Sequence, residues 1–219
     1  MITVHHLDNS RSQRVLWLLE ELELPYEIKA YKRGKDMLAP PELKAVHPLG
    51  KSPVLSDGGL IIAETGAIFD YVLTTYGNRR LMPLNGSEER LSYTYWMYYA
   101  EGSAMTPLLL KLLTTGIRTH APWLIKPIAA AIAQRINSRL VTPNLVANID
   151  FWENTLTQSP WFAGTEFSAA DIMMSFPLEA AASRADAGGK PHIRAWLEKI
   201  HARPAYQRAL ARGGPYAYA

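Results

Sequence analysis

The sequence predicts two parts of different class, a small α/β domain followed by an all-α domain. Three observations support this prediction. Short β-rich and helical segments alternate in the first ~80 residues, a linker containing Pro, Gly and Asn follows, and only helical periodicity recurs after it. We therefore place an α/β domain at residues 1–78, a linker at 79–86 and a helical domain at 87–219.

The first part is expected to have the order βαβαββα. Alternating or β-rich runs mark the strands, helical spacing marks the helices, and Pro or Gly ends each segment. The segments are, in chain order, ITVHHL, RSQRVLWLLEEL, YEIKAY, PPELKAV, SPVL, LIIAE and TGAIFDYVLTTYG. A helix separates the first two strands, so we expect them to pair in parallel. Asp57-Gly58-Gly59 separates the next two, which predicts a hairpin.

The second part is expected to be helical throughout. Its first segment, residues 88–113, is a long aromatic-rich helix that we expect to bend near Pro107. In the segment FSAADIMMSF, Ser168 can cap a helix, with Asp171 three positions later. We assign these two residues to folding. The last two helices are expected to break near Pro204.

Composition excludes several classes of function. The chain has 219 residues, 48% hydrophobic and 20% charged, and no cysteine. The absence of cysteine excludes a protein-borne thiol nucleophile, disulfides and thiolate metal sites, and we expect no metal. Any thiol chemistry therefore needs the thiol of a ligand. The net charge of +3 comes without a block of Lys or Arg, so we expect no nucleic-acid partner. We see neither a membrane-length apolar run nor a signal peptide, so we expect a cytoplasmic protein without a membrane partner.

Five stretches, in this order, resemble the cytosolic glutathione S-transferase family over essentially the whole chain. They are NSRSQRVLWLLEELELPYE, HPLGKSPVL, ETGAIFDYV, SPWFAGTEFSAADI and IHARPAYQRAL. The likeness is greatest to a bacterial-type branch with a serine at the active position. It implies a thioredoxin-like N-terminal domain, a helical C-terminal domain, glutathione as co-substrate and a homodimer.

The resemblance also implies an activity. Members typically conjugate the glutathione thiolate to hydrophobic electrophiles, and we expect that reaction here. Some members instead act as glutathione-dependent peroxidases or isomerases, and others are non-catalytic glutathione-binding scaffolds. Because the fold does not decide among these, they remain the alternatives.

Two hydroxyls in NSRSQR, at the start of the first helix, are candidate donors to the glutathione sulfur. The thiolate is the nucleophile, and a free thiol has a pKa of about 8.5, so the site must stabilise the thiolate. A hydroxyl at a helix N-terminus adds a hydrogen bond and a favourable dipole. The resemblance points to Ser10, with Ser12 and Asn9 as alternates. The residues alone also fit a capping box in which Gln13 reaches back to Ser10.

HPLGKSPVL is expected to bind the cysteinyl and glycine parts of glutathione. By resemblance, Pro53 follows a cis peptide bond and Ser52 offers its N–H and C=O to the cysteinyl backbone. Lys51 and His47 could contact the glycine carboxylate. Without the resemblance, Lys51 is a solvated loop lysine and His47 is a surface or helix-end histidine.

ETGAIFDYV is expected to bind the γ-glutamyl part. The helix N-terminus and the Thr65 hydroxyl would take its carboxylate, and Glu64 would take its ammonium group. The alternative is that both residues only cap the helix. By resemblance, Glu101 could reach across a dimer to the same amine, and the alternative is a surface glutamate.

The electrophile is expected to bind between the domains, against apolar and aromatic groups. Tyr99 and Ser103 follow helical spacing on one side of the first long helix and are the candidates for this pocket. An aromatic stripe of this kind also fits a core or a dimer interface, so that alternative stays open.

Overall fold

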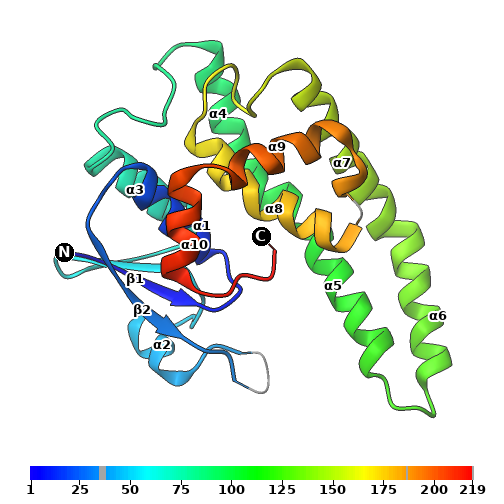
Figure 1. Cartoon of the computed structure of the whole chain (residues 1–219). Coiled ribbons are helices and arrows are strands. Elements are labelled where there is room, and N and C mark those ends of the chain that lie inside the picture. The colour runs from blue at the N-terminus through cyan, green and yellow to red at the C-terminus, as the bar shows by residue number, and fades with distance from the viewer. Residues whose placement is uncertain (35–37, 186, 219) are drawn as a thin grey trace.

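The computed structural model of the chain describes residues 1–34, 38–185 and 187–218. The predicted order βαβαββα is confirmed. The elements are β1 (Ile2–Leu7), α1 (Ser12–Glu21), β2 (Tyr26–Tyr31), α2 (Pro41–Val46), β3 (Val54–Asp57), β4 (Leu60–Ala63) and α3 (Thr65–Thr75). The predicted α/β thioredoxin-like part is therefore present (Figure 1).

The four strands form one mixed sheet in the order β2-β1-β3-β4. β1 and β2 pair in parallel, as predicted from the helix between them. β3 is antiparallel to both β1 and β4. The β3–β4 turn has positive φ at Gly58 (53°) and Gly59 (92°), a conformation that glycine adopts at little cost. The peptide bond between Ser52 and Pro53 is cis, as predicted.

The rest of the described chain is helical, as predicted. Its elements are α4 (Glu88–Tyr99), η1 (Ala100–Ala104), α5 (Met105–His120), α6 (Lys126–Ile136), η2 (Asn137–Val141), α7 (Thr142–Gln158), α8 (Ala169–Ala185), η3 (Ala187–Gly189), α9 (Pro191–His201) and α10 (Pro204–Gly213). Residues 76–87 contain neither helix nor strand, and the linker at 79–86 remains a prediction. Within the described ranges, no helix combines the length and apolarity needed to cross a bilayer.

The long helix is irregular in the turn before Pro107, near which a bend was predicted. The helix is interrupted by the π-helical turn η1, and Pro107 is the third residue of α5. Proline has no N–H for the carbonyl four residues earlier, and its ring crowds that carbonyl. The strain is relieved in the turn before the proline, and a π-helical turn is one form that such relief takes. This places Glu101 and Ser103 on an irregular turn.

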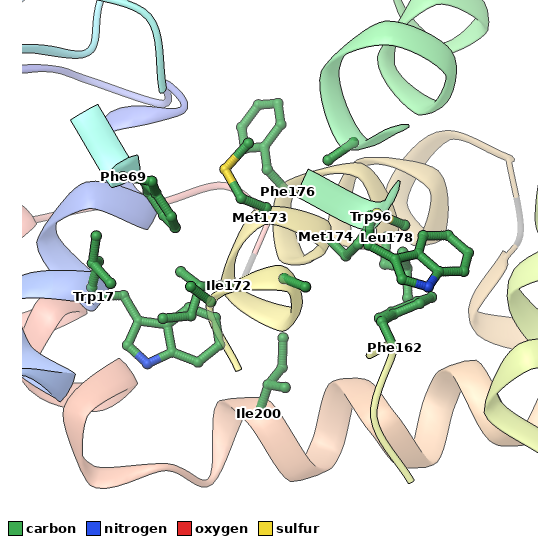
Figure 2. Packing of buried hydrophobic residues seen from close by; sticks show 14 of the residues in the cluster. Trp17, Phe69, Trp96, Phe162, Ile172, Met173, Met174, Phe176, Leu178 and Ile200 are labelled. Atoms are coloured by element: carbon green, nitrogen blue, oxygen red, sulfur yellow. The ribbon is translucent and has the colours of Figure 1, made fainter. Parts of the chain in front are cut away.

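The two parts of the chain share one hydrophobic core. Trp17 of α1 and Phe69 of α3 belong to the same buried cluster as Trp96, Phe162 and Ile200 of the helical part (Figure 2). α8 packs against α1, α4, α5 and α9, and its residues from Ala169 to Ala181 are all buried. In Figure 1, α10 lies beside α1, against which it packs. The start of α1 is thereby held from both parts of the molecule.

The start of α8 is fixed by Asp171, and the Ser168 hydroxyl donates to Asp171 rather than accepting from a helix N–H among the described residues. The Asp171 carboxylate accepts hydrogen bonds from the backbone N–H of Ser168 (3.0 Å) and of Phe162 (2.9 Å). It also accepts one from the Ser168 hydroxyl at 3.3 Å. Asp171 is fully buried, and burial raises its pKa to about 6 against the opposing effect of these hydrogen bonds. Its role in the described structure is therefore to hold α8 and the preceding loop.

Candidate functional site

A small cleft lies where the start of α1, the segment before β3 and the β4–α3 junction meet. Six of the nine residues that line it were predicted to bind glutathione. The lining residues are Arg11, His47, Leu49, Lys51, Ser52, Pro53, Ala63, Glu64 and Thr65. Segments far apart in sequence thus converge because β1 and β3 are neighbours in the sheet and α3 begins directly after β4.

Ser10 borders this cleft through Ser52. Its Oγ donates to Ser52 Oγ at 3.3 Å, and Ser52 Oγ donates to the carbonyl of His5 at 3.0 Å. Ser52 Oγ also accepts from the backbone N–H of Leu7 at 3.2 Å. Ser52 therefore ties the loop before β3 to β1, and it places Ser10 next to the backbone expected to bind the cysteinyl part.

The two candidate hydroxyls lie together but differ in exposure. Ser10 and Ser12 Oγ atoms are 2.6 Å apart, and Ser10 is 6% exposed whereas Ser12 is 0% exposed. Ser12 is also held from behind, with its Oγ 2.8 Å from Nδ1 of His6. Ser10 is thus the hydroxyl nearer to the cleft. The sequence pattern indicates only that His6 lies in a strand and gives no signal of its contact with Ser12.

The capping-box interpretation of this segment is wrong. Arg11 occupies the N-cap position of α1 without a side-chain capping bond, and the Gln13 amide has no hydrogen-bond partner among the described residues. Ser10 Oγ accepts instead from the backbone N–H of Ser12 at 3.2 Å. Ser10 uses one lone pair in this way, and its proton is directed at Ser52 Oγ by a long bond of 3.3 Å that a ligand sulfur could replace.

Asn9, the third alternate, is placed differently. It is exposed and has a positive φ of 47°, which asparagine tolerates better than most residues. Its side-chain oxygen accepts a hydrogen bond from the backbone N–H of Ala217 at 2.8 Å. Asn9 therefore joins the C-terminal tail to the loop before α1.

The β4–α3 junction has an unusual backbone. Glu64, at the N-cap of α3, has φ 71° and ψ 127°, a region that costs a non-glycine residue of order 1–3 kcal/mol. Such strain is concentrated at ligand-binding positions, where it directs backbone groups toward a ligand. Thr65 follows as the buried first residue of α3 and lines the cleft with Glu64, so the helix begins at the cleft. The first N–H groups of a helix have no partner within it and can bind an anion.

Three charged residues form a network beside the junction. Arg14 is 1% exposed and bonds through Nη2 to Glu101 and to Thr65 Oγ1 (3.4 Å), and through Nη1 to the carbonyl of Met173 (2.8 Å). Arg11 lies 2.7 Å from the second oxygen of Glu101. Two cations therefore share one carboxylate. Burial opposes ionisation of Glu101, but Arg14 and Arg11 outweigh it and lower the pKa of this carboxyl.

Arg11 was missed as a site residue. Its signal in the sequence was its position, because a cation at a helix N-terminus is unfavourable unless an anion compensates it. The first turn of α1 contains no acidic residue, and the compensation comes from Glu101, far away in sequence. Glu101 itself is engaged within its own chain, and a contact across a dimer remains a prediction.

The two candidates for the electrophile pocket lie in different surroundings. Tyr99 is buried in the helical part, where its hydroxyl donates to Asn148 and accepts from Trp152 Nε1 at 3.2 Å. Its ring also stacks on that of Tyr95, with the two ring centroids 5.4 Å apart. Ser103 is exposed on η1, two residues after Glu101. Tyr99 therefore lies in the hydrophobic core, which was the alternative to a role in the electrophile pocket.

His47 and Lys51 complete the cleft. His47 is partly buried, and its Nδ1 has no hydrogen-bond partner within the described part of the chain. Lys51 is exposed at the rim. No group of three or more His, Asp or Glu residues that could hold a metal ion was found among the described residues.

The architecture is that of a thioredoxin-like domain with a helical C-terminal domain, and the comparisons with known proteins agree. The model of the glutathione S-transferase N-terminal domain matches residues 1–74, and that of the C-terminal domain matches residues 129–211. Glutathione S-transferase 1 of Saccharomyces cerevisiae is 35% identical over 99% of this chain and 98% of its own length.

Solved structures give the same result. A glutathione S-transferase from Actinobacillus pleuropneumoniae has 32% identity and a TM-score of 0.80, and the match covers 100% of this chain and 95% of that one. A theta-class glutathione S-transferase from Xanthomonas axonopodis, with glutathione bound, has 25% identity and a TM-score of 0.72 over 95% of this chain and 96% of its own. The chain belongs to the glutathione S-transferase family.

Proposed function

We propose that the protein binds glutathione in the cleft at the start of α1 and conjugates its thiolate to a hydrophobic electrophile. One observation carries the proposal. The cleft brings together separate polar groups suited to each end of glutathione, and the Ser10 hydroxyl lies beside them, 3.3 Å from Ser52 Oγ. The similar theta-class structure that contains glutathione supports the same ligand here.

The γ-glutamyl end would bind at the start of α3. Its carboxylate would accept from the Thr65 hydroxyl and from the free N–H groups of the helix, while Glu64 would take the ammonium group. Arg11 and Arg14 share Glu101, which leaves one positive charge in excess in that network. This excess supports binding of an anionic ligand nearby.

The other end of glutathione would bind along the loop before β3. The backbone of Ser52, before the cis peptide bond to Pro53, would pair with the cysteinyl part. Lys51 and His47 would contact the glycine carboxylate, Lys51 as a point charge and His47 through its unpartnered Nδ1. This arrangement directs the cysteinyl sulfur toward Ser10.

Ser10 would then donate its proton to the sulfur and stabilise the thiolate. A hydrogen bond to a charged group contributes about 1.5–3 kcal/mol, which corresponds to lowering the thiol pKa by about 1–2 units. From a free value of about 8.5, such a shift makes a large share of the bound thiol ionised at neutral pH.

We place the electrophile on the helical side of the cleft, near η1. Ser103 is exposed there and could contact it, while Tyr99 would support the wall from the core rather than touch the substrate. We also propose a cytoplasmic homodimer. Exposed apolar side chains on α5, among them Leu112, Leu113 and Ile117, would gain from being covered by a second copy.

The test is conjugation of glutathione to a generic aryl halide, followed by absorbance, with binding measured separately by calorimetry. Ser10→Ala should bind glutathione but lose most of the turnover. A wild-type protein that binds glutathione and turns over neither this substrate nor a wider panel of electrophiles would contradict the proposed activity. Light scattering that shows a monomer would contradict the proposed dimer.

A further inference from the structure

A chain of hydrogen bonds leads from Ser10 into the interior and ends on a histidine. Ser10 Oγ lies 2.6 Å from Ser12 Oγ, and Ser12 Oγ lies 2.8 Å from Nδ1 of His6. All three side chains are buried. The chain therefore joins the edge of the cleft to an imidazole in the protein interior.

The opposite side of the imidazole determines which nitrogen can accept a proton. The backbone of Gly213, at the end of α10, takes part in a hydrogen bond with His6 that favours the charged ring, so its carbonyl is the acceptor. Because Nδ1 faces Ser12, the nitrogen that donates to Gly213 is Nε2. Nδ1 of the neutral ring is then an acceptor directed at the Ser12 hydroxyl.

The ring is neutral when glutathione arrives. Burial lowers the pKa of His6, and the Gly213 carbonyl and the Asp8 carboxylate oppose this effect without overcoming it. A neutral imidazole can take up a proton, and the resulting imidazolium would have a hydrogen-bond acceptor at each nitrogen, the Gly213 carbonyl and Ser12 Oγ.

We propose that His6 receives the proton of the glutathione thiol through Ser10 and Ser12. This inference rests on the proposed function, in which Ser10 lies against the sulfur. The S–H bond breaks as its proton passes to Ser10 Oγ, the Ser10 proton passes to Ser12 Oγ, and the Ser12 proton passes to Nδ1 of His6. A thiol and an imidazole become a thiolate and an imidazolium, with no proton gained or lost overall.

The transfer also reverses the direction of both hydroxyls. Nδ1–H of His6 now donates to Ser12, Ser12 donates to Ser10, and Ser10 donates to the thiolate. Bonds that point the same way strengthen one another. His6 therefore acts as a positioning residue as well as a proton store, and once the thiolate has reacted its imidazolium returns the proton to solvent.

The test compares two quantities when glutathione binds to the full chain near neutral pH. Thiolate formed is measured by ultraviolet absorbance, and protons released are measured with a pH indicator in weak buffer. The wild-type protein should release clearly fewer protons than the thiolates it forms, because His6 retains a share of them. One proton released for each thiolate formed in the wild-type protein would overturn the inference.

Two variants separate proton uptake from positioning. His6→Phe keeps a planar ring without an acceptor, so it should release one proton per thiolate and raise the bound thiol's pKa by up to about 1.5 units. That is the effect of a unit charge roughly 8–10 Å away at an effective dielectric constant of about 20. His6→Asn keeps an acceptor near the position of Nδ1 but no base, so it should also release one proton per thiolate.

His5 supplies a matched control on the same strand. It is buried like His6, but its Nε2 lies 2.7 Å from Ser56 Oγ and its Nδ1 lies 2.9 Å from the Tyr31 hydroxyl. His5→Phe should keep the wild-type ratio of protons to thiolate. A ratio in His6→Phe equal to the wild-type ratio would overturn the inference.

The wild-type ratio needs no variant, so it decides the question even if His6→Phe does not fold. It also separates the two proposals. Thiolate formed with full proton release overturns only the role of His6. No thiolate formed in the wild-type protein overturns the proposed function as well.

Discussion

The Arg11–Arg14–Glu101 network gives a stability prediction whose size follows from burial. Glu101→Gln removes the charge that compensates Arg14, whose side chain is 1% exposed. Removing one partner of a buried ion pair costs about 3–5 kcal/mol. The Glu101 side chain is 27% exposed and glutamine keeps an acceptor, while Arg14 keeps the Met173 carbonyl. We therefore expect a loss of about 2–3 kcal/mol in the free energy of unfolding.

The assay is urea denaturation at neutral pH, with Glu198→Gln as the control. Glu198 is an exposed glutamate on α9, and its substitution should change the free energy of unfolding by no more than about 0.5 kcal/mol. A loss of that small size in Glu101→Gln would refute the argument that Arg14 depends on Glu101.

The pH dependence of the same difference gives a second check. The pKa of Glu101 in the folded state lies below the ordinary value of 4.5. The contribution of the charge is therefore fully present above about pH 4.5 and is lost as the pH falls through the lowered pKa. The gap between wild type and Glu101→Gln should shrink below that pH, and a gap that widened there would contradict the assignment.

Three further predictions concern the cap and the cleft. Asp171→Ala leaves two buried N–H groups without an acceptor, so it should lower the free energy of unfolding by about 3 kcal/mol or more in urea denaturation. The control, Asp70→Ala at an exposed site on α3, should change that free energy little. Thr65→Val removes the hydroxyl proposed to bind the γ-glutamyl carboxylate, so it should raise KM for glutathione about tenfold or more with kcat nearly unchanged. The control, Thr75→Val at the exposed end of α3, should leave KM unchanged. Lys51→Ala should raise KM about threefold at low salt and less at high salt, and an effect independent of salt would argue against a charge contact.

Much of the fold could be predicted because its signals are local. The turn at Gly58 and Gly59, the helix between the first two strands and the proline before β3 each constrain only a few neighbouring residues. The six residues predicted to bind glutathione line one cleft, since β1, β3 and the start of α3 have fixed positions in this topology. Their contact with glutathione remains a prediction.

The remainder depends on contacts between distant segments. Arg11 and Glu101 meet only after η1 has packed beside α1, and His6 reaches Ser12 because β1 and the start of α1 fold against each other. Tyr99 has the same helical spacing as exposed neighbours, and only packing against α7 buries it. The capping-box prediction was wrong because the local sequence pattern does not determine the position of the Gln13 side-chain amide, which is buried without a hydrogen-bond partner among the described residues.

The central claim is that the Ser10 hydroxyl stabilises the glutathione thiolate. The most direct measurement is the pKa of the bound thiol, obtained from thiolate absorbance against pH in wild type, Ser10→Ala and Ser12→Ala. Wild type should lie about 1–2 units below the free value of about 8.5, Ser10→Ala should return close to it, and Ser12→Ala should fall between the two. An unchanged pKa in Ser10→Ala together with a full loss in Ser12→Ala would contradict the claim.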